Sequence, residues 1–292
     1  KRFAHCPLRD RRPRLRARQN RLVRSGDPIC VCSQPTDKQK ASEVTNDMDT
    51  ITTARRLAGP IGEFGARFML DPATFSRSTE LGLPASLASY VQGRIGVMGE
   101  LDTATVIDNK LFFDEGLVAR YWEEPCGLSK SEAGVAYASI CAERGAAYLD
   151  GFSNAPRLAE LLERVADSAD DSKAALFAGW RDAARPDNDH GRAYLLLATI
   201  RELRGCRHMW ATRSAGADPL GMVLANGGEQ TAKLHGYGDR YMDHTATDAD
   251  QVAAIEATTD EANAADFSCL TDDERAELVA LVEAAVDHAA ER

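Results

Sequence analysis

The stretch from His190 to Ser214 restricts the fold of this chain more than any other part of the sequence. Four large aliphatic residues in its first half would lie on several faces of a helix: Leu195, Leu196, Leu197 and Ile200. A helix that is apolar nearly all round must be covered on every side, so it belongs in the middle of a bundle. We therefore predict an all-α fold, a helical bundle around this long buried central helix.

The sequence after Met48 supports this fold class, because strong helix formers (Ala, Leu, Glu and Arg) dominate it. Alternating runs of Val, Ile, Thr and Tyr, which are typical of strands, are nearly absent. Capping boxes at Ser129–Glu132 and Thr271–Glu274 mark two helix starts. The other helices are predicted at about 53–70, 84–99, 103–110, 115–123, 172–184 and 248–264, and after Asn154 and Asp218.

Two glycine-containing stretches affect these predictions. We expect Gly227-Gly228 to close the helix that follows Asp218, and the segment from Glu229 to His244 to be irregular. Gly93, Gly96 and Gly99 fall inside a predicted helix, where glycine costs stability unless another backbone packs closely against it.

The first 47 residues differ sharply from the rest in charge. They carry 12 basic and 5 acidic side chains, a net charge of +7, whereas residues 48–292 carry 23 and 40, a net charge of −17. We predict a disordered basic tail over 1–47. It could be a nucleic-acid-binding arm or a transit peptide, but we favour a translated upstream sequence, with the native start at Met48.

Composition excludes several classes of protein. A net charge of −10 and a pI near 5.2 do not suit a general DNA coat, and no apolar run is long enough to span a bilayer. The seven scattered cysteines contain no CxxC pair, so we expect free thiols in a reducing cytoplasm. P-loop, GxGxxG, HExxH and GxSxG motifs are absent, so we predict no cofactor and no metal.

The candidate site begins where the central helix becomes polar. Arg204 and His208 are four residues apart and share a helix face, and Glu202 lies about a third of a turn away. An imidazole beside arginines is held neutral at pH 7, which suits an anionic ligand or a general base. Tyr90 and Arg94 form a second pair at this spacing, and Arg94 could reach Glu202 across the bundle.

Structural roles compete with this interpretation. The same five residues (Tyr90, Arg94, Glu202, Arg204 and His208) could form buried ion pairs that tie helices together. For each residue taken singly we favour that role. The aromatic residues Phe112, Phe113, Tyr121 and Trp122 are best explained by core packing. The loop His235-Gly-Tyr-Gly-Asp239 is too short a signal to predict a phosphate-binding site.

Three stretches resemble a largely uncharacterised actinobacterial family, described as SalK-like or helix-turn-helix. They are Tyr90–Gly99 with Phe113–Trp122, Leu203–His208, and Ile255–Asp260. The resemblance covers nearly all of 48–292 and implies a helical N-terminal part and a winged-helix-like segment near the C-terminus. It also implies that Arg94, Arg204 and His208 match family motifs, and it brings no established activity.

The resemblance divides the chain further, into a bundle domain over 48–226 and a reduced, winged-helix-like segment over 227–292. The stretch between Gly227 and Ile255 is short for a recognition helix and a wing. It offers Lys233 and Arg240 and then turns acidic, whereas a DNA-reading helix presents Arg, Lys, Asn or Gln. This composition argues against DNA binding.

Three functions follow from the sequence. The first is a regulator-type protein that binds a small molecule, an anion being one candidate, in a pocket of the five residues named above. The second is an enzyme of specialised metabolism with His208 as general base. The third is a DNA-binding transcriptional regulator. We expect a cytoplasmic protein without membrane contact, and a homodimer is compatible with the sequence.

Overall fold

The computed structural model describes residues 48–291, which belong to the compact unit Thr45–Arg292. Within 48–291 every regular element is an α-helix or a short 3-10 helix, so the predicted all-α fold is confirmed. None of these helices is long and apolar enough to cross a membrane. The tail predicted over 1–47, with Cys6, Cys30 and Cys32, lies outside the described residues.

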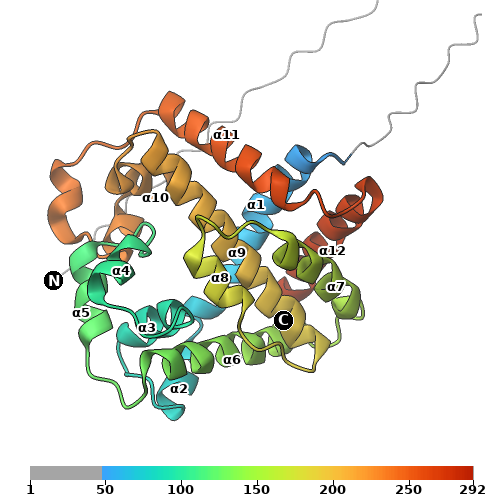
Figure 1. Ribbon diagram of the computed structural model, residues 1–292, viewed down its shortest axis with the longest axis horizontal. Coiled ribbons are helices and arrows are strands. Elements are labelled where there is room, and N and C mark those ends of the chain that lie inside the picture. Colours follow the sequence, from blue (N-terminus) through green and yellow to red (C-terminus); the bar gives the residue numbers. More distant parts are fainter. Residues whose placement is uncertain (1–47, 292) are drawn as a thin grey trace, which may run out of the picture. The chain divides into compact units, whose positions relative to one another are not determined.

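The long helix α9 (Asp189–Ser214) crosses the middle of this unit, as predicted (Figure 1). It begins at Asn188, whose side chain accepts a hydrogen bond of 2.6 Å from the backbone NH of Gly191. Leu195, Leu196 and Leu197 are fully buried. The helices around it are α1 (Thr50–Ala66), α6 (Lys130–Tyr148), α7 (Ala155–Ser168), α8 (Ala175–Arg181) and α11 (Ala249–Asp266).

Three shorter helices form a subassembly with an apolar core of its own. They are α3 (Ala88–Gly96), α4 (Thr103–Asp108) and α5 (Glu115–Glu123). The buried residues that they share are Val91, Ile95, Val106, Val118 and Trp122. Asp102 and Asp114 cap α4 and α5, since each carboxylate accepts a hydrogen bond from a backbone NH in the first turn of its helix.

This subassembly joins the bundle where α3 crosses α6 at two glycines. A Cβ on Gly96 would lie 2.2 Å from the carbonyl oxygen of Lys130, and one on Gly134 would lie 2.3 Å from the carbonyl carbon of Gly96. No side chain fits between the two backbones there. The close backbone approach expected along this glycine series is therefore confirmed at Gly96, whereas a Cβ on Gly93 would meet the side chain of Tyr137 at 2.4 Å, and Gly99 lies beyond the end of α3.

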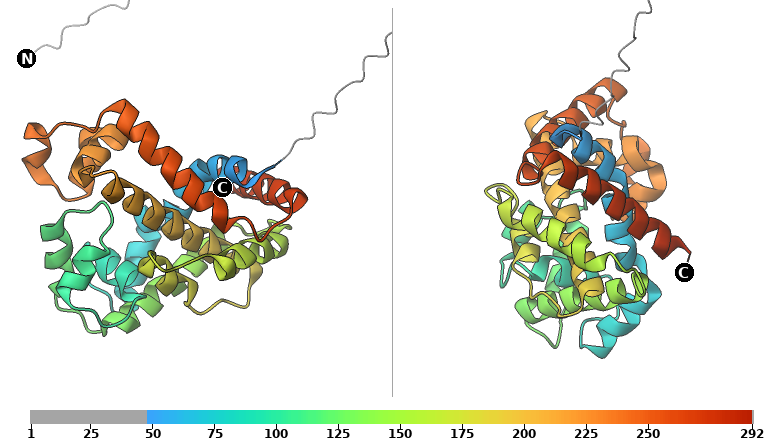
Figure 2. Two further views of the ribbon diagram at one scale, coloured as in Figure 1. Left: turned by 45° about the horizontal axis from the view of Figure 1, so that its top comes forward. Right: turned by 90° about the vertical axis from the view of Figure 1, so that its right-hand side faces the viewer.

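The N-terminal helix α1 lies beside the two C-terminal helices, α11 and α12 (Asp272–Ala290) (Figure 2). Arg275 of α12 donates a hydrogen bond of 2.7 Å to the carbonyl oxygen of Met48, which fastens the start of the described chain to its end. Both predicted capping boxes are present, at Ser129–Glu132 and Thr271–Glu274.

The structure differs from the sequence prediction at several helix ends. The first helix stops at Ala66 rather than near residue 70, and a 3-10 helix η1 (Arg67–Leu70) and the helix α2 (Pro72–Glu80) follow. Asp71 explains the second start, because its carboxylate accepts a hydrogen bond from the NH of Ala73, and Pro72 suits the first helical position. The predicted helices 84–99 and 172–184 are shorter, at 88–96 and 175–181.

The helix after Asp218, α10 (Pro219–Leu234), is interrupted at the predicted glycine pair. Gly228 adopts φ 65° and ψ −166°, which is not helical, so two helical segments meet there at a kink. The predicted helix end is therefore present, but a second helical segment continues to Leu234, where irregular structure was expected. Between 227 and 291 only helices occur, among them the 3-10 helix η2 (Gly238–Asp243), so helices stand where a wing would have strands.

A candidate anion-binding cavity beside the central helix

Arg94 and Glu202 form a bidentate ion pair in the interior, as the sequence predicted. Nη2 of Arg94 lies 2.6 Å from Oε2 of Glu202 and Nε lies 3.1 Å from Oε1, and both side chains are buried. Burial acts to raise the pKa of Glu202, but the positive charges of Arg94 and Arg201 outweigh it and hold that pKa below its ordinary value. The pair is therefore fully charged at neutral pH.

Arg201 binds the same carboxylate. Its Nη1 lies 2.8 Å from Oε1 of Glu202, and its Nε donates a hydrogen bond of 3.2 Å to the carbonyl oxygen of Gly62. Among the described residues, Glu202 is the only carboxylate in an ion pair with either arginine. Two guanidinium groups thus share one carboxylate, which leaves the cluster with one uncompensated positive charge. Arg201 keeps 28% of its side chain exposed and carries that charge outward.

A cavity of about 220 Å³ opens at Arg201. Its polar wall consists of Tyr90, Arg201 and His235, and the remaining lining is apolar. Leu70, Phe75 and Leu234 form the apolar rim, where they are 65%, 40% and 54% exposed. The walls come from α1, η1, α2, α3, α9 and α10, so segments far apart in the sequence build one pocket.

His235 separates this cavity from a second one. Its ring stacks on Phe113 with the ring centroids 4.5 Å apart. Burial is the main cause that lowers the pKa of His235 to about 4, and the positive charges of Arg94 and Arg201 act in the same direction. His235 is therefore neutral at pH 7. The second cavity, of about 360 Å³, has His235, His208 and Phe112 in its wall.

This neutral histidine predicts an acid-sensitive fold. The folded protein takes up the His235 proton only below about pH 4, whereas the unfolded chain takes it up near the ordinary value of 6.5. The free energy of unfolding should therefore fall as the pH drops from 6.5 to 4, by up to about 1.4 kcal/mol per pH unit. Urea titrations across this range check the slope, and His235→Gln should flatten it. An unchanged slope in that variant would contradict the assignment.

Arg204 and His208 face the other side, toward α11. Arg204 pairs with Glu256 at 3.0 Å and with Asp260 at 3.2 Å, and Nδ1 of His208 lies 3.1 Å from the hydroxyl of Thr259. Burial is the main cause that lowers the pKa of His208, and the charge of Arg204 adds to it. The direction expected from the sequence is confirmed, although burial rather than the arginines dominates.

The five predicted site residues therefore fall into two groups. Tyr90 lines the first cavity with Arg201, and Arg94 and Glu202 are joined to Arg201 by ion pairs, whereas Arg204 and His208 contact α11. The expectation that all five would converge on one pocket needs correction, because Glu202 and Arg204 are two residues apart and so project to nearly opposite sides of a helix. His235, which lines both cavities, is the link between the groups.

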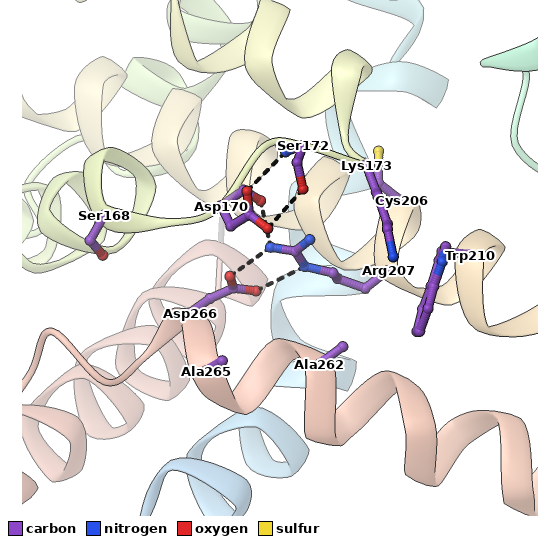
Figure 3. Close-up of a pocket in the computed structure, with 10 residues that line it drawn as sticks. All are labelled: Ser168, Asp170, Ser172, Lys173, Cys206, Arg207, Trp210, Ala262, Ala265 and Asp266. Carbon is purple, nitrogen blue, oxygen red and sulfur yellow. Dashed lines mark hydrogen bonds and ion pairs between the residues drawn. The ribbon is translucent and has the colours of Figure 1, made fainter.

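A further cavity, of about 400 Å³, contrasts with the first in its charge balance (Figure 3). The guanidinium of Arg207 lies between Asp170 and Asp266, 2.8 Å from a carboxylate oxygen of Asp266 and 2.6 Å from the Asp170 carbonyl. Nζ of Lys173 lies over the ring of Trp210. Arg207 is therefore paired with a carboxylate of its own, that of Asp266, and this ion pair is explained by a structural role in linking helices.

Across residues 48–291, no three His, Cys, Asp or Glu side chains gather as a metal ion would require. Cys126, Cys141, Cys206 and Cys269 are free thiols. The candidate chemistry in this part of the chain therefore rests on arginine, tyrosine and histidine.

Two residues of the first cavity were missed as site residues. Arg201 lies about one helical turn before Arg204, and its partner Glu202 is the next residue in the sequence. His235 is the first residue of the glycine-containing loop His235–Asp239, which is too short to predict a phosphate-binding site. The sequence feature that could have identified His235 is its position directly after Leu234, because a histidine that follows an apolar residue at a helix end is often partly buried.

Comparison with known proteins gives one match. A family model described as a helix-turn-helix family matches residues 54–243, which include every residue that lines the first cavity. No curated protein and no solved structure matches the chain. The match agrees with the helix-turn-helix part of the resemblance seen in the sequence, while its SalK-like and actinobacterial parts stay predictions. The chain belongs to a helix-turn-helix family.

Proposed function

We propose that the protein is a DNA-binding transcriptional regulator. The observation that carries this proposal is the family match over 54–243, because helix-turn-helix proteins as a class read DNA with the second helix of the motif. The acidic composition of the chain, taken alone, argued against DNA binding. The family membership outweighs that argument, since overall charge limits the strength of phosphate contacts rather than their presence.

The pair α4–α5 is the best candidate for the motif. These helices are joined by residues 109–114 and pack with α3 around a core of their own, as a small reading module would. As the second helix of the pair, α5 would be the recognition helix. Its exposed charged residues are Glu115, Arg120 and Glu123, so it offers one cation to a phosphate or a base edge.

We expect sequence-specific binding with a shallow salt dependence, because few cations are available for phosphates. Fluorescence anisotropy should compare the duplex upstream of the gene with a shuffled duplex, between 50 and 200 mM salt. Arg120→Gln should weaken binding, whereas Arg56→Gln, which removes an exposed arginine paired with Glu283, should not. Equal affinity for both duplexes, or no binding at 50 mM salt, would refute the proposal.

Small-molecule binding is a second candidate function, and the uncompensated charge at the first cavity favours it. The excess positive charge is carried by the partly exposed Arg201, which shares its only carboxylate with Arg94, and an anionic ligand would balance that charge. The pocket of this function is the cavity at Tyr90, Arg201 and His235, with Arg94 and Glu202 behind it. Catalysis with His208 as general base stays a prediction, and no contact of His208 favours it over a structural role.

A further inference from the structure

We propose that the cavity at Arg201 binds a small organic monoanion with an aromatic or alicyclic body, such as an aryl carboxylate. The proposal rests on the second candidate function, small-molecule binding, and names the class of ligand. Two independent features of the cavity lead to it: the charge at its polar end and the exposed apolar rim at its mouth.

The charge defines the head of the ligand. Arg94 and Arg201 contribute two positive charges and Glu202 one negative charge, while His235 is neutral at pH 7. One negative charge balances this cluster, whereas a dianion such as a phosphate monoester would leave an excess. A cation would be repelled by the same cluster.

The polar lining supplies two donors for a carboxylate, from Arg201 and Tyr90. Nε and Nη1 of Arg201 are used by Gly62 and Glu202, which leaves Nη2 as the donor free for a ligand within the described residues. Burial raises the pKa of Tyr90, so its hydroxyl keeps its proton and can donate as well. A guanidinium and a hydroxyl in one wall provide the charge-assisted hydrogen bonds that hold a carboxylate.

The rim defines the body of the ligand. Leu70, Phe75 and Leu234 are exposed, although large apolar side chains are normally buried. Met69, Leu87 and Phe113 continue the apolar lining behind them. A flat apolar group that enters here would remove this surface from water while its carboxylate reaches Arg201.

Isothermal titration calorimetry with 2-naphthoate tests the proposal, with 2-naphthamide as the neutral control of the same shape. We expect the amide to bind at least about tenfold more weakly, because it loses the ion pair with Arg201. Arg201→Gln should weaken naphthoate binding by about ten- to a hundredfold, and Arg201→Lys should restore part of it.

The fold should survive Arg201→Gln, since Arg94 and Glu202 then form a balanced pair, and an unchanged thermal midpoint will show this.

A matched pair of surface variants tests the rim. Leu234→Gln should weaken naphthoate binding severalfold, whereas Met242→Gln, 64% exposed and outside the cavity lining, should not.

Equal affinities for the acid and the amide would overturn the proposal, as would unchanged naphthoate binding in Arg201→Gln. The proposal would also be overturned if the protein is a dimer that does not bind naphthoate and that Leu234→Gln converts to a monomer. The apolar rim would then be the contact surface for a second copy of the chain. DNA binding is measured separately by anisotropy. Failure of the ligand proposal therefore leaves the regulator proposal standing, and the reverse also holds.

Discussion

Glu202→Gln is expected to lower the free energy of unfolding by about 3–5 kcal/mol, the cost of leaving a buried charge without its partner. Glu202 is fully buried and is the shared partner of Arg94 and Arg201. Its loss would leave the buried guanidinium of Arg94 and the partly exposed one of Arg201 without a carboxylate. Urea denaturation followed by circular dichroism measures the change. The matched control is Glu143→Gln, whose partner Arg77 lies on the surface, and it should leave the midpoint nearly unchanged.

A second variant separates the buried charge from the loss of packing. In the double variant Arg94→Met, Glu202→Leu, apolar groups of similar volume replace the pair, and most of the lost stability should return. Arg201 can then turn its guanidinium toward solvent, because its side chain is already 28% exposed. A loss below about 1 kcal/mol in Glu202→Gln would show that the carboxylate is solvated, which would contradict the charge count on which the cavity proposal depends.

Gly134→Ala should destabilise the protein by about 1–3 kcal/mol or more, because it overpacks the crossing of α3 and α6. The new Cβ would lie 2.3 Å from backbone atoms of Gly96 and Val97, and helix backbones cannot yield as a flexible side chain can. The same substitution at Gly62 of α1 meets no atom within 4 Å. There it should stabilise the helix by about 0.5–1 kcal/mol. Thermal unfolding of both variants provides the comparison.

This crossing matters to the site because α3 carries both Tyr90 and Arg94. If the helices move apart, Arg94 loses its bidentate contact with Glu202 and Tyr90 leaves the cavity wall. Gly134→Ala should therefore weaken binding of an aryl carboxylate as well as stability, whereas Gly62→Ala should leave binding unchanged. Equal effects of the two substitutions on stability would contradict the close approach of α3 and α6.

The sequence predicted features that depend on one helix or on a local signal. A run of apolar residues around every face of His190–Ser214 required a central position, and the structure places α9 there. The side chains of Ser129 and Thr271 start helices through capping boxes, which are local by nature. The Arg94–Glu202 pair was predicted because a buried arginine among glycines needs a carboxylate on a neighbouring helix.

Features that depend on how helices rotate against one another were not predicted. The sequence of residues 201–208 predicts a single polar cluster. The positions of α3 and α11 decide which partner each of these side chains contacts. The second helical segment after Gly228 was not predicted either, because a glycine pair commonly ends a helix and nothing local shows that another helix follows at once. The rim residues carry no signal at all, since Leu70, Phe75 and Leu234 come together only through the tertiary fold.

A crystal structure of the protein with bound 2-naphthoate tests the central claim most directly. The account predicts the carboxylate at a hydrogen-bonding distance of about 2.7–3.2 Å from Nη2 of Arg201, with the hydroxyl of Tyr90 as a second donor. The naphthyl rings should lie against Phe75 and Leu234. Density for the ligand at another site, or a carboxylate that points into solvent while Arg201 contacts only Glu202 and Gly62, would contradict it.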